Sequence, residues 1–294
     1  MERDNLFRVA GFDIRITAVD NANDYIGLIP SFAPFKTEHS TDEPLLTMTV
    51  DNGMPPRHDG DLVLKADTGN GITLVFKLPE GGYQYIIRNV QGHDCSMLQT
   101  NSDFSQCRCA LNGTHDMMAF GLNDALMLAF TFAACRHQTL MIHASCVMNG
   151  GWAYPFTASS GTGKSTHSNL WMTHIPGTEL MNDDNPIIRI ADGEAYIYGS
   201  PWSGKTPCYR NVKARIGAIT KIERAKQNSI ERQPAVKGFG TMLSACSSMK
   251  WDSHLYNALC DTITKVIETV PLFTLHCLPD KEAALLCHKT IRRP

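Results

Sequence analysis

Two segments of this chain have the residue types and the spacing of a phosphate-binding loop. The strict pattern G-x-x-x-x-G-K-[ST] fits residues 199–206, which read GSPWSGKT. A second stretch, residues 158–166 (ASSGTGKST), has alanine in place of the first glycine. Such a loop binds nucleotide phosphates through backbone N–H groups at the start of a helix. The surroundings of each segment therefore decide which one binds a nucleotide.

These surroundings favour the stretch that contains the alanine. Residues 151–157 before it are mostly apolar, as in a buried strand, and residues 164–172 contain no Gly or Pro and can form the outgoing helix. In residues 199–206, Pro201 removes one N–H group and Pro207 follows where the helix would continue. We therefore predict that the alanine-containing stretch is the phosphate loop, and that residues 199–206 form a turn between two strands.

The phosphate loop supplies several predicted contacts to a nucleotide. Gly161 and Gly163 allow the backbone to curve closely around an anion. Lys164 would reach the outer phosphates, and the Ser165 hydroxyl would bind Mg²⁺. The predicted nucleotide-binding residues of the loop are Ser159, Ser160, Gly161, Thr162, Gly163, Lys164, Ser165 and Thr166.

A pair of aspartates provides the expected second anchor for Mg²⁺. Asp183 and Asp184 end a predicted strand, and Asp183 lies 19 residues after Lys164, with one helix and one strand between them. Two adjacent carboxylates allow one to bind the metal while the other accepts a proton from an attacking hydroxyl. We therefore predict Ser165, Asp183 and Asp184 as metal ligands. The alternative is an acidic turn before Asn185.

Basic residues in and after the turn at 199–206 support a further hypothesis. Lys205 and Arg210 follow a predicted strand, and loops at strand ends of an open α/β sheet face the ligand crevice. We expect Lys205 or Arg210 to contact the γ-phosphate or the phosphoryl acceptor. The alternative is an exposed basic turn without such a role.

The elements that must position these residues fall into two parts. Residues 1–118 contain alternating apolar segments separated by turns with Gly, Asn and Asp, which predicts a β-rich module. Its expected strands lie within 7–19, 45–50, 62–64, 72–78 and 83–90. Residues 119–294 mix strands and helices, which predicts an α/β domain. Its expected strands are 140–147, 152–157, 180–184, 187–190, 195–198, 216–222 and 272–278, and its expected helices are 124–137, 164–172, 236–248, 252–269 and 281–290.

Composition and charge exclude several classes of protein. The net charge of −2 and the scattered Lys and Arg argue against a nucleic-acid surface. The N-terminal residues lack the apolar core of a signal peptide, and residues 125–135 are too short to span a bilayer, so we expect a buried helix there. The ten cysteines contain no C-x-x-C pair and predict reduced, buried thiols of a cytoplasmic protein, with a metal site at Cys107 and Cys109 as the alternative.

Residues 143–168 (HASCVMNGGWAYPFTASSGTGKSTHS) resemble the core of two families. In ATP-dependent phosphoenolpyruvate carboxykinases, a strand with Met-His-x-Ser precedes an S-G-T-G-K-[ST]-T loop, and a later strand ends in Asp-Asp. HPr kinase/phosphorylase is similar, with a strand histidine, an S-G-x-G-K-S loop and an Asp-Asp pair. The resemblance covers about residues 139–190. It implies an α/β fold with the mixed-sheet P-loop core of these families.

This resemblance also implies cofactors and roles. The cofactors are ATP and Mg²⁺. His143 matches the histidine near the γ-phosphate or a second metal, although a histidine in such an apolar strand is more often a core residue. Asp183 and Asp184 match the acidic pair, with Asp183 as the base. Lys164 would then stabilise the transferred charge as a catalytic residue. Because HPr kinases form oligomers, a homo-oligomer is implied as well.

The departures from both families limit the choice of reaction. The chain is too short for a full carboxykinase and lacks a counterpart of its oxaloacetate-binding arginines, and it lacks the C-terminal signature of HPr kinase/phosphorylase. Its layout resembles shorter HPr-kinase-related proteins. The predicted function is a kinase that transfers the γ-phosphoryl group of ATP to a hydroxyl of a small molecule or a protein serine. The alternatives are an ATP-binding partner or regulatory protein without catalysis, and a carboxykinase-like lyase.

Overall fold

The computed structural model describes residues 5–19, 25–40, 43–67, 69–204 and 206–294, and it divides the chain into two compact units. The first unit is Met1–Ala134 and the second is Cys135–Pro294. The division lies later than the expected boundary at 118/119, which falls inside a helix. Both units contain a mixed sheet, and the second also contains four α-helices among its described residues. The predicted α/β class is therefore confirmed.

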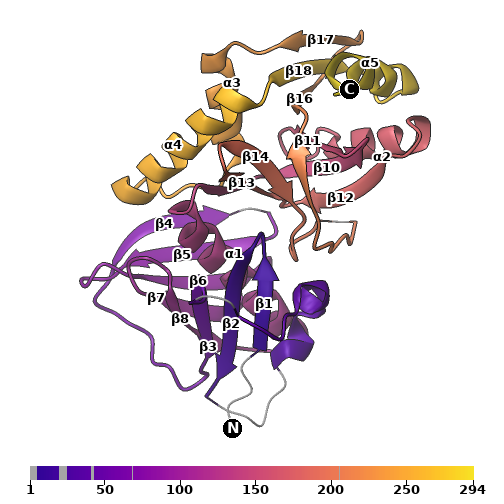
Figure 1. Cartoon of the computed structure of the whole chain (residues 1–294). Coiled ribbons are helices and arrows are strands. Elements are labelled where there is room, and N and C mark those ends of the chain that lie inside the picture. The colour runs from indigo at the N-terminus through magenta and orange to yellow at the C-terminus, as the bar shows by residue number, and fades with distance from the viewer. Residues whose placement is uncertain (1–4, 20–24, 41–42, 68, 205) are drawn as a thin grey trace. The chain divides into compact units, whose positions relative to one another are not determined.

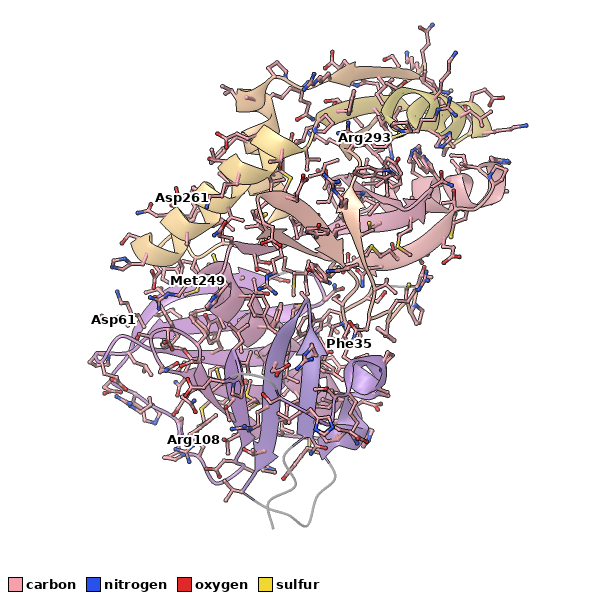
Figure 2. The ribbon with its side chains drawn as sticks, in the orientation of Figure 1. Phe35, Asp61, Arg108, Met249, Asp261 and Arg293 are labelled. Atoms are coloured by element: carbon pink, nitrogen blue, oxygen red, sulfur yellow. The ribbon has the colours of Figure 1, made fainter. Side chains whose placement is uncertain are left out.

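The first unit is an eight-stranded sheet with order β1-β2-β3-β8-β7-β6-β5-β4. Its pairs are antiparallel except β2–β3 and β3–β8, which are parallel. The described elements are β1 (Asn5–Val9), β2 (Phe12–Ala18), η1 (Tyr25–Leu28), η2 (Pro30–Phe35), β3 (Leu46–Val50), β4 (Asp61–Asp67), β5 (Gly71–Lys77), β6 (Tyr83–Asn89), β7 (Asp94–Thr100), β8 (Gln106–Leu111) and α1 (His115–Cys135). Figures 1 and 2 show these elements without and with their side chains.

Helix α1 corrects the expected helix at residues 124–137. It begins at His115, nine residues before the expected start at 124, and the Thr114 hydroxyl accepts a hydrogen bond from the Met117 N–H at 3.4 Å. The apolar run at 125–135 is thus only the second half of a longer helix. Helix α1 is long and apolar enough to cross a membrane by length and composition, but most of it is buried in the protein, as in a core helix.

The second unit contains a ten-stranded sheet with order β17-β18-β16-β11-β15-β14-β13-β9, while β10 pairs with both β11 and β12. The strands are β9 (Thr139–Met141), β10 (Ala144–Asn149), β11 (Trp152–Thr157), β12 (Glu179–Asp184), β13 (Ile187–Ala191), β14 (Glu194–Tyr198), β15 (Lys213–Ile216), β16 (Ile219–Arg224), β17 (Ser229–Arg232) and β18 (Leu272–Cys277). The helices are α2 (Lys164–His174), α3 (Ala235–Ala245), α4 (Ser253–Thr269) and α5 (Lys281–Ile291).

Two expected strands are each interrupted in this unit. The strand expected at 140–147 breaks after β9, because the His143 N–H bonds to the Ala245 carbonyl at the end of α3. The strand expected at 216–222 breaks at Gly217, which lies against the Tyr154 ring so closely that a side chain would not fit. Strands β7, β8 and β17 were not predicted. Residues 199–204, the described start of the predicted turn, lie in the connection between β14 and β15, as predicted.

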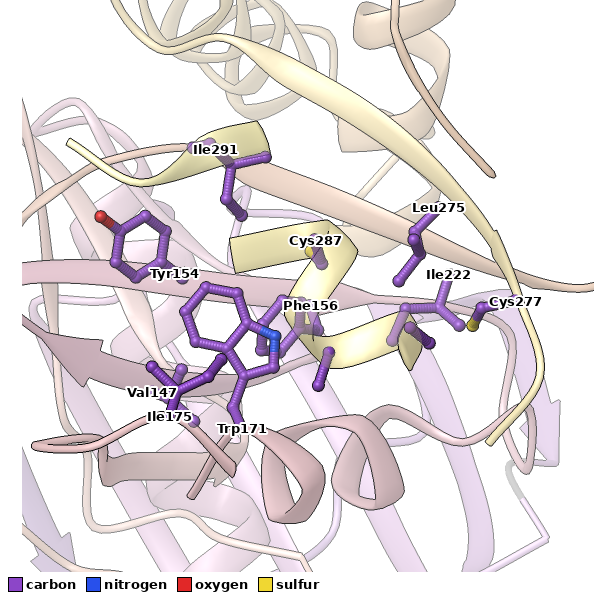
Figure 3. Packing of buried hydrophobic residues seen from close by; sticks show 13 residues of the cluster. Val147, Tyr154, Phe156, Trp171, Ile175, Ile222, Leu275, Cys277, Cys287 and Ile291 are labelled. Carbon is purple, nitrogen blue, oxygen red and sulfur yellow. The ribbon is translucent and has the colours of Figure 1, made fainter. Parts of the chain in front are cut away.

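A buried apolar cluster joins α2 and α5 to the sheet (Figure 3). Trp171 of α2 lies at its centre, with its ring centroid 5.2 Å from that of Tyr154 and 5.3 Å from that of Phe156. At the C-terminal end, the Arg293 N–H donates to the Tyr154 hydroxyl at 3.0 Å. This cluster fixes α2, whose first residues follow the phosphate loop, against β11.

All ten cysteines are free thiols, seven of them buried. Burial raises the pKa of the Cys109 thiol to about 12, so it stays protonated at neutral pH. No group of three or more His, Cys, Asp or Glu residues placed to hold a metal ion is found in the described part of the chain. Buried, uncharged thiols are what the sequence predicts. Among the described residues, no further His, Cys, Asp or Glu joins Cys107 and Cys109 in a group that could hold a metal ion.

Candidate active site

Strand β10 brings the predicted site residues to one edge of the sheet. It runs antiparallel to β11 and β12, and Ala144 pairs with both Thr157 and Asp184. Because Thr157 is the last residue before the phosphate loop, the end of β11, the start of β10 and the end of β12 meet at this edge. His143 precedes Ala144 and therefore lies beside both the loop and the aspartates.

The predicted phosphate loop connects β11 to α2, and several of its residues are exposed. Gly161 has φ of +73° and Gly163 has φ of +124°, conformations that favour glycine. Ser159, Ser160 and Gly161 are exposed, and so is Thr166 in the first turn of α2. Helix α2 begins at Lys164, and no side chain of the described residues caps its N-terminus. Free N–H groups at such a helix start favour an anion.

Three polar side chains converge at the start of α2. Nε2 of His143 lies 2.9 Å from Nζ of Lys164 and 2.9 Å from Oδ1 of Asp184. A single ring nitrogen either donates or accepts, so it donates to Asp184 when protonated and accepts from Lys164 when not. The tautomer of His143 thus decides which partner it bonds.

These contacts shift the protonation of the lysine and the carboxylate. Burial lowers the pKa of Lys164, and the charges of Asp184 and Asp183 offset this only in part. Burial alone would raise the pKa of Asp184, but the hydrogen bond and charge of His143 and the charge of Lys164 hold it below its usual range. Asp184 is therefore ionised at neutral pH and can accept a proton or bind a cation.

Asp183 makes a different contact from its neighbour. The Ser165 hydroxyl donates to Asp183, with Oγ 2.9 Å from Oδ1 and 3.2 Å from Oδ2. Two neighbouring ligands of an octahedral Mg²⁺ at about 2.0–2.1 Å are about 2.9 Å apart. The Ser165 and Asp183 oxygens therefore fit one Mg²⁺, whose remaining ligands would be phosphate and water. Asp183 is almost fully buried, whereas the side chain of Asp184 is 38% exposed.

Arg224 is a candidate site residue that sequence reasoning missed. It ends β16, which runs parallel to β11, and its guanidinium donates to the carbonyls of Gly161 at 2.5 Å and Thr162 at 3.2 Å. These bonds hold the carbonyls on one side of the loop. The only signal in the sequence was its place at the end of a predicted strand, and the pairing of that strand was unknown.

Arg210, which was expected to contact the γ-phosphate or the acceptor, lies away from the phosphate loop. Arg210 donates to the Leu180 carbonyl at 2.6 Å and to Glu179 at 2.9 Å, at the start of β12. Five residues of strand separate Glu179 from Asp184, which is about 16 Å. The structure therefore does not bring Arg210 to the phosphate loop. Lys205 lies outside the described residues.

A buried histidine on α2 should make the fold sensitive to acid. Burial lowers the pKa of His167 from 6.5 to about 4. Between these values the unfolded chain binds a proton that the folded chain does not, so stability is lost as the pH falls from 6.5 towards 4. We expect this group to cost about 3 kcal/mol of unfolding free energy by pH 4. Urea unfolding at a series of pH values measures the loss.

The His167→Gln variant separates this effect from that of other titrating groups. Glutamine keeps an acceptor for the Trp171 indole N–H, which lies 3.1 Å from Nε2 of His167. The variant should lose less stability than the wild type between pH 6.5 and pH 4. Parallel curves for the two proteins would show that His167 does not carry the effect.

Comparisons with known proteins give limited information on this chain. No family model matches it, and a search of curated proteins found no match. Among solved structures, half of the chain is weakly similar to the Hpr(Ser) kinase/phosphatase from Coxiella burnetii. The TM-score is 0.32 and the identity 9%, over 51% of this chain and 95% of that chain. A similarity this weak assigns neither a family nor a reaction.

Proposed function

We propose that this chain is an ATP-dependent kinase of the HPr-kinase-related type, which transfers the γ-phosphoryl group of ATP to a hydroxyl of a small molecule or a protein serine. One observation carries the proposal: the open helix start at Lys164 lies beside a hydroxyl–carboxylate pair and a second, ionised carboxylate. Phosphoryl transfer needs these parts for binding phosphate, binding metal and accepting a proton. A P-loop core of this type and a cytoplasmic homo-oligomer belong to the same proposal.

In this mechanism the loop backbone and three side chains hold the nucleotide and its metal ion. Backbone N–H groups of the loop and the Lys164 ammonium bind the outer phosphates. Ser165 and Asp183 would hold Mg²⁺, which would supply neutralisation of charge on the phosphate oxygens. Lys164 is mostly buried, so its charge acts where little water screens it.

Asp184 is the better candidate for the base. The sequence suggests Asp183 for this role, so the two aspartates exchange their expected roles. Asp183 is buried and bonded to Ser165, whereas Asp184 is ionised and partly exposed. The acceptor oxygen would attack the γ-phosphorus while the bond between the γ-phosphorus and the β–γ bridging oxygen breaks. The proton of the acceptor hydroxyl would pass to Asp184. ADP then leaves. Through its hydrogen bond, His143 would orient the Asp184 carboxylate.

The direct test follows the γ-phosphoryl group. The protein is incubated with γ-labelled ATP, Mg²⁺ and a panel of hydroxyl acceptors that begins with free serine and HPr. Label on an acceptor, absent without Mg²⁺ and absent with Lys164→Ala, is the expected result. Tight ATP binding without transfer would favour the non-catalytic partner, and nucleotide-dependent decarboxylation of oxaloacetate would favour a carboxykinase-like lyase. Either result would contradict the kinase.

Arg224→Ala is expected to weaken binding of Mg²⁺–ATP by about tenfold, since the loop loses bonds from a charged donor. The rate of transfer at saturating ATP should change much less, because the guanidinium bonds loop carbonyls rather than the base. Isothermal titration of Mg²⁺–ATP measures the change. Lys226→Ala, which removes an exposed charge two residues further along, is the control. Equal affinities in the two variants would exclude a role for Arg224 in holding the loop.

A further inference from the structure

Residues 199–204, which begin the segment that fits the strict phosphate-loop pattern, lie against the end of β12. The Gly204 N–H donates a hydrogen bond to the Asp183 carbonyl, and the Ser203 hydroxyl lies 3.0 Å from the same oxygen. The backbones of Ser203 and Asp184 also form a β-bridge. The segment is therefore bonded to the residues that carry the two site carboxylates.

A buried asparagine anchors this segment on its other side. Nδ2 of Asn182 lies 3.1 Å from the Trp202 carbonyl and 3.2 Å from Oγ of Ser200. The Asn185 N–H donates to Oδ1 of Asn182 at 3.0 Å, and Oγ of Ser200 lies 2.7 Å from the Asn185 carbonyl. Because unpairing buried polar groups is costly, the segment and the aspartate turn form one rigid unit.

Within this unit, Asp184 has an unusual backbone and Gly204 leaves room for it. The φ of Asp184 is +123°, which residues other than glycine seldom adopt and which persists only where the surroundings enforce it. A Cβ added to Gly204 would lie 3.0 Å from Cβ of Asp184 and 3.3 Å from its Cγ. A larger residue at 204 would therefore require Asp184 to shift by a few tenths of an ångström.

We propose that residues 199–204 are a clamp that enforces the backbone of Asp184 and aims its carboxylate at His143, with Gly204 as the positioning residue. The clamp rests on the proposed function, in which Asp184 is the base. The same hydrogen bond makes the segment poorly suited to hold a phosphate, because the Gly204 N–H already bonds the Asp183 carbonyl. Glycine is needed at position 204 because a larger side chain would press against Asp184, not because the backbone must approach a nucleotide there.

Gly204→Ala tests this clamp against a matched variant. Gly240→Ala is the control, because Gly240 is exposed on α3 and nothing lies within 4 Å of its added Cβ. We expect Gly204→Ala to lower kcat by about tenfold or more, since small displacements of a catalytic group are costly. The affinity for Mg²⁺–ATP should stay within about twofold, because the phosphate loop is untouched. Thermal unfolding of both variants is measured alongside.

A second measurement does not depend on turnover. The NMR signal of the His143 imidazole, assigned with His143→Gln, reports the position of its Asp184 partner at 2.9 Å. It should shift in Gly204→Ala and not in Gly240→Ala. A shifted signal in a protein without transferase activity would support the clamp and contradict the kinase. An unshifted signal with wild-type kcat, or a general loss of ATP binding, would overturn the clamp.

Discussion

Replacing Asp184 with asparagine is expected to lower the rate of phosphoryl transfer by about 10³-fold, because the amide cannot take the acceptor's proton. Binding of Mg²⁺–ATP should change by no more than about twofold, since Ser165 and Asp183 remain in place. Asparagine has nearly the same shape and also tolerates positive φ, so the strained backbone should persist. Single-turnover transfer to the acceptor, together with titration of Mg²⁺–ATP, measures both quantities.

Asp183→Asn is the matched variant, one residue away and with the same change in charge. It should raise the Mg²⁺ concentration needed for half-maximal rate, because an amide is a weaker ligand than a carboxylate. Excess Mg²⁺ should restore part of the rate of Asp183→Asn and none of the rate of Asp184→Asn. If excess Mg²⁺ instead rescues Asp184→Asn, the roles of the two aspartates are those expected from the sequence.

Trp171→Ala should have the largest effect on stability, with a loss of about 3–5 kcal/mol of unfolding free energy. Trp171 is fully buried, and Figure 3 shows it among residues of β11, β18 and α5. Its ring centroid also lies 5.2 Å from that of His288 on α5. Removing the indole would leave a cavity between α2, α5 and the sheet. Urea unfolding at neutral pH measures the loss.

Two variants on the same helix provide the controls. Asn169→Ala changes an exposed residue of α2 and should alter stability by less than about 0.5 kcal/mol. Trp171→Phe keeps an aromatic ring but loses the hydrogen bond from the indole N–H to His167, and should fall between the two. If Trp171→Ala unfolded at the same urea concentration as Asn169→Ala, the cluster would not be the core that holds α2.

Local patterns predicted the elements around the phosphate loop well. Strand β11 (Trp152–Thr157) and the start of α2 at Lys164 lie where the apolar run and the glycines indicated. Short apolar segments bounded by Gly and Pro are local signals, so one sequence is enough to recognise them. The start of α1 was predicted wrongly, because Gly121 lies between its first turns and the predicted start at 124, and an isolated glycine lowers the helical signal.

Contacts between distant residues were not predictable in this way. Arg224 reaches the carbonyls of Gly161 and Thr162 only because β16 pairs with β11 in parallel. Arg210 was expected at the phosphates but bonds Glu179, because the connection after β14 returns along β12 towards its start. A motif describes residues that are close in the sequence. The contacts of Arg224 and Arg210 join residues that are far apart in the sequence, so no motif reports them.

The sequence alone determined the chemistry available to this protein: a glycine-rich loop before a helix, a lysine and a serine at its start, a histidine upstream and two carboxylates at a strand end. Only the tertiary structure decided how the two carboxylates differ. Adjacent residues of a strand point to opposite faces, so the register of β10 and β12 and the unusual φ of Asp184 place Asp183 at Ser165 and Asp184 at His143. The same packing bonds residues 199–204, the start of a phosphate-loop pattern, to the turn that carries Asp183 and Asp184.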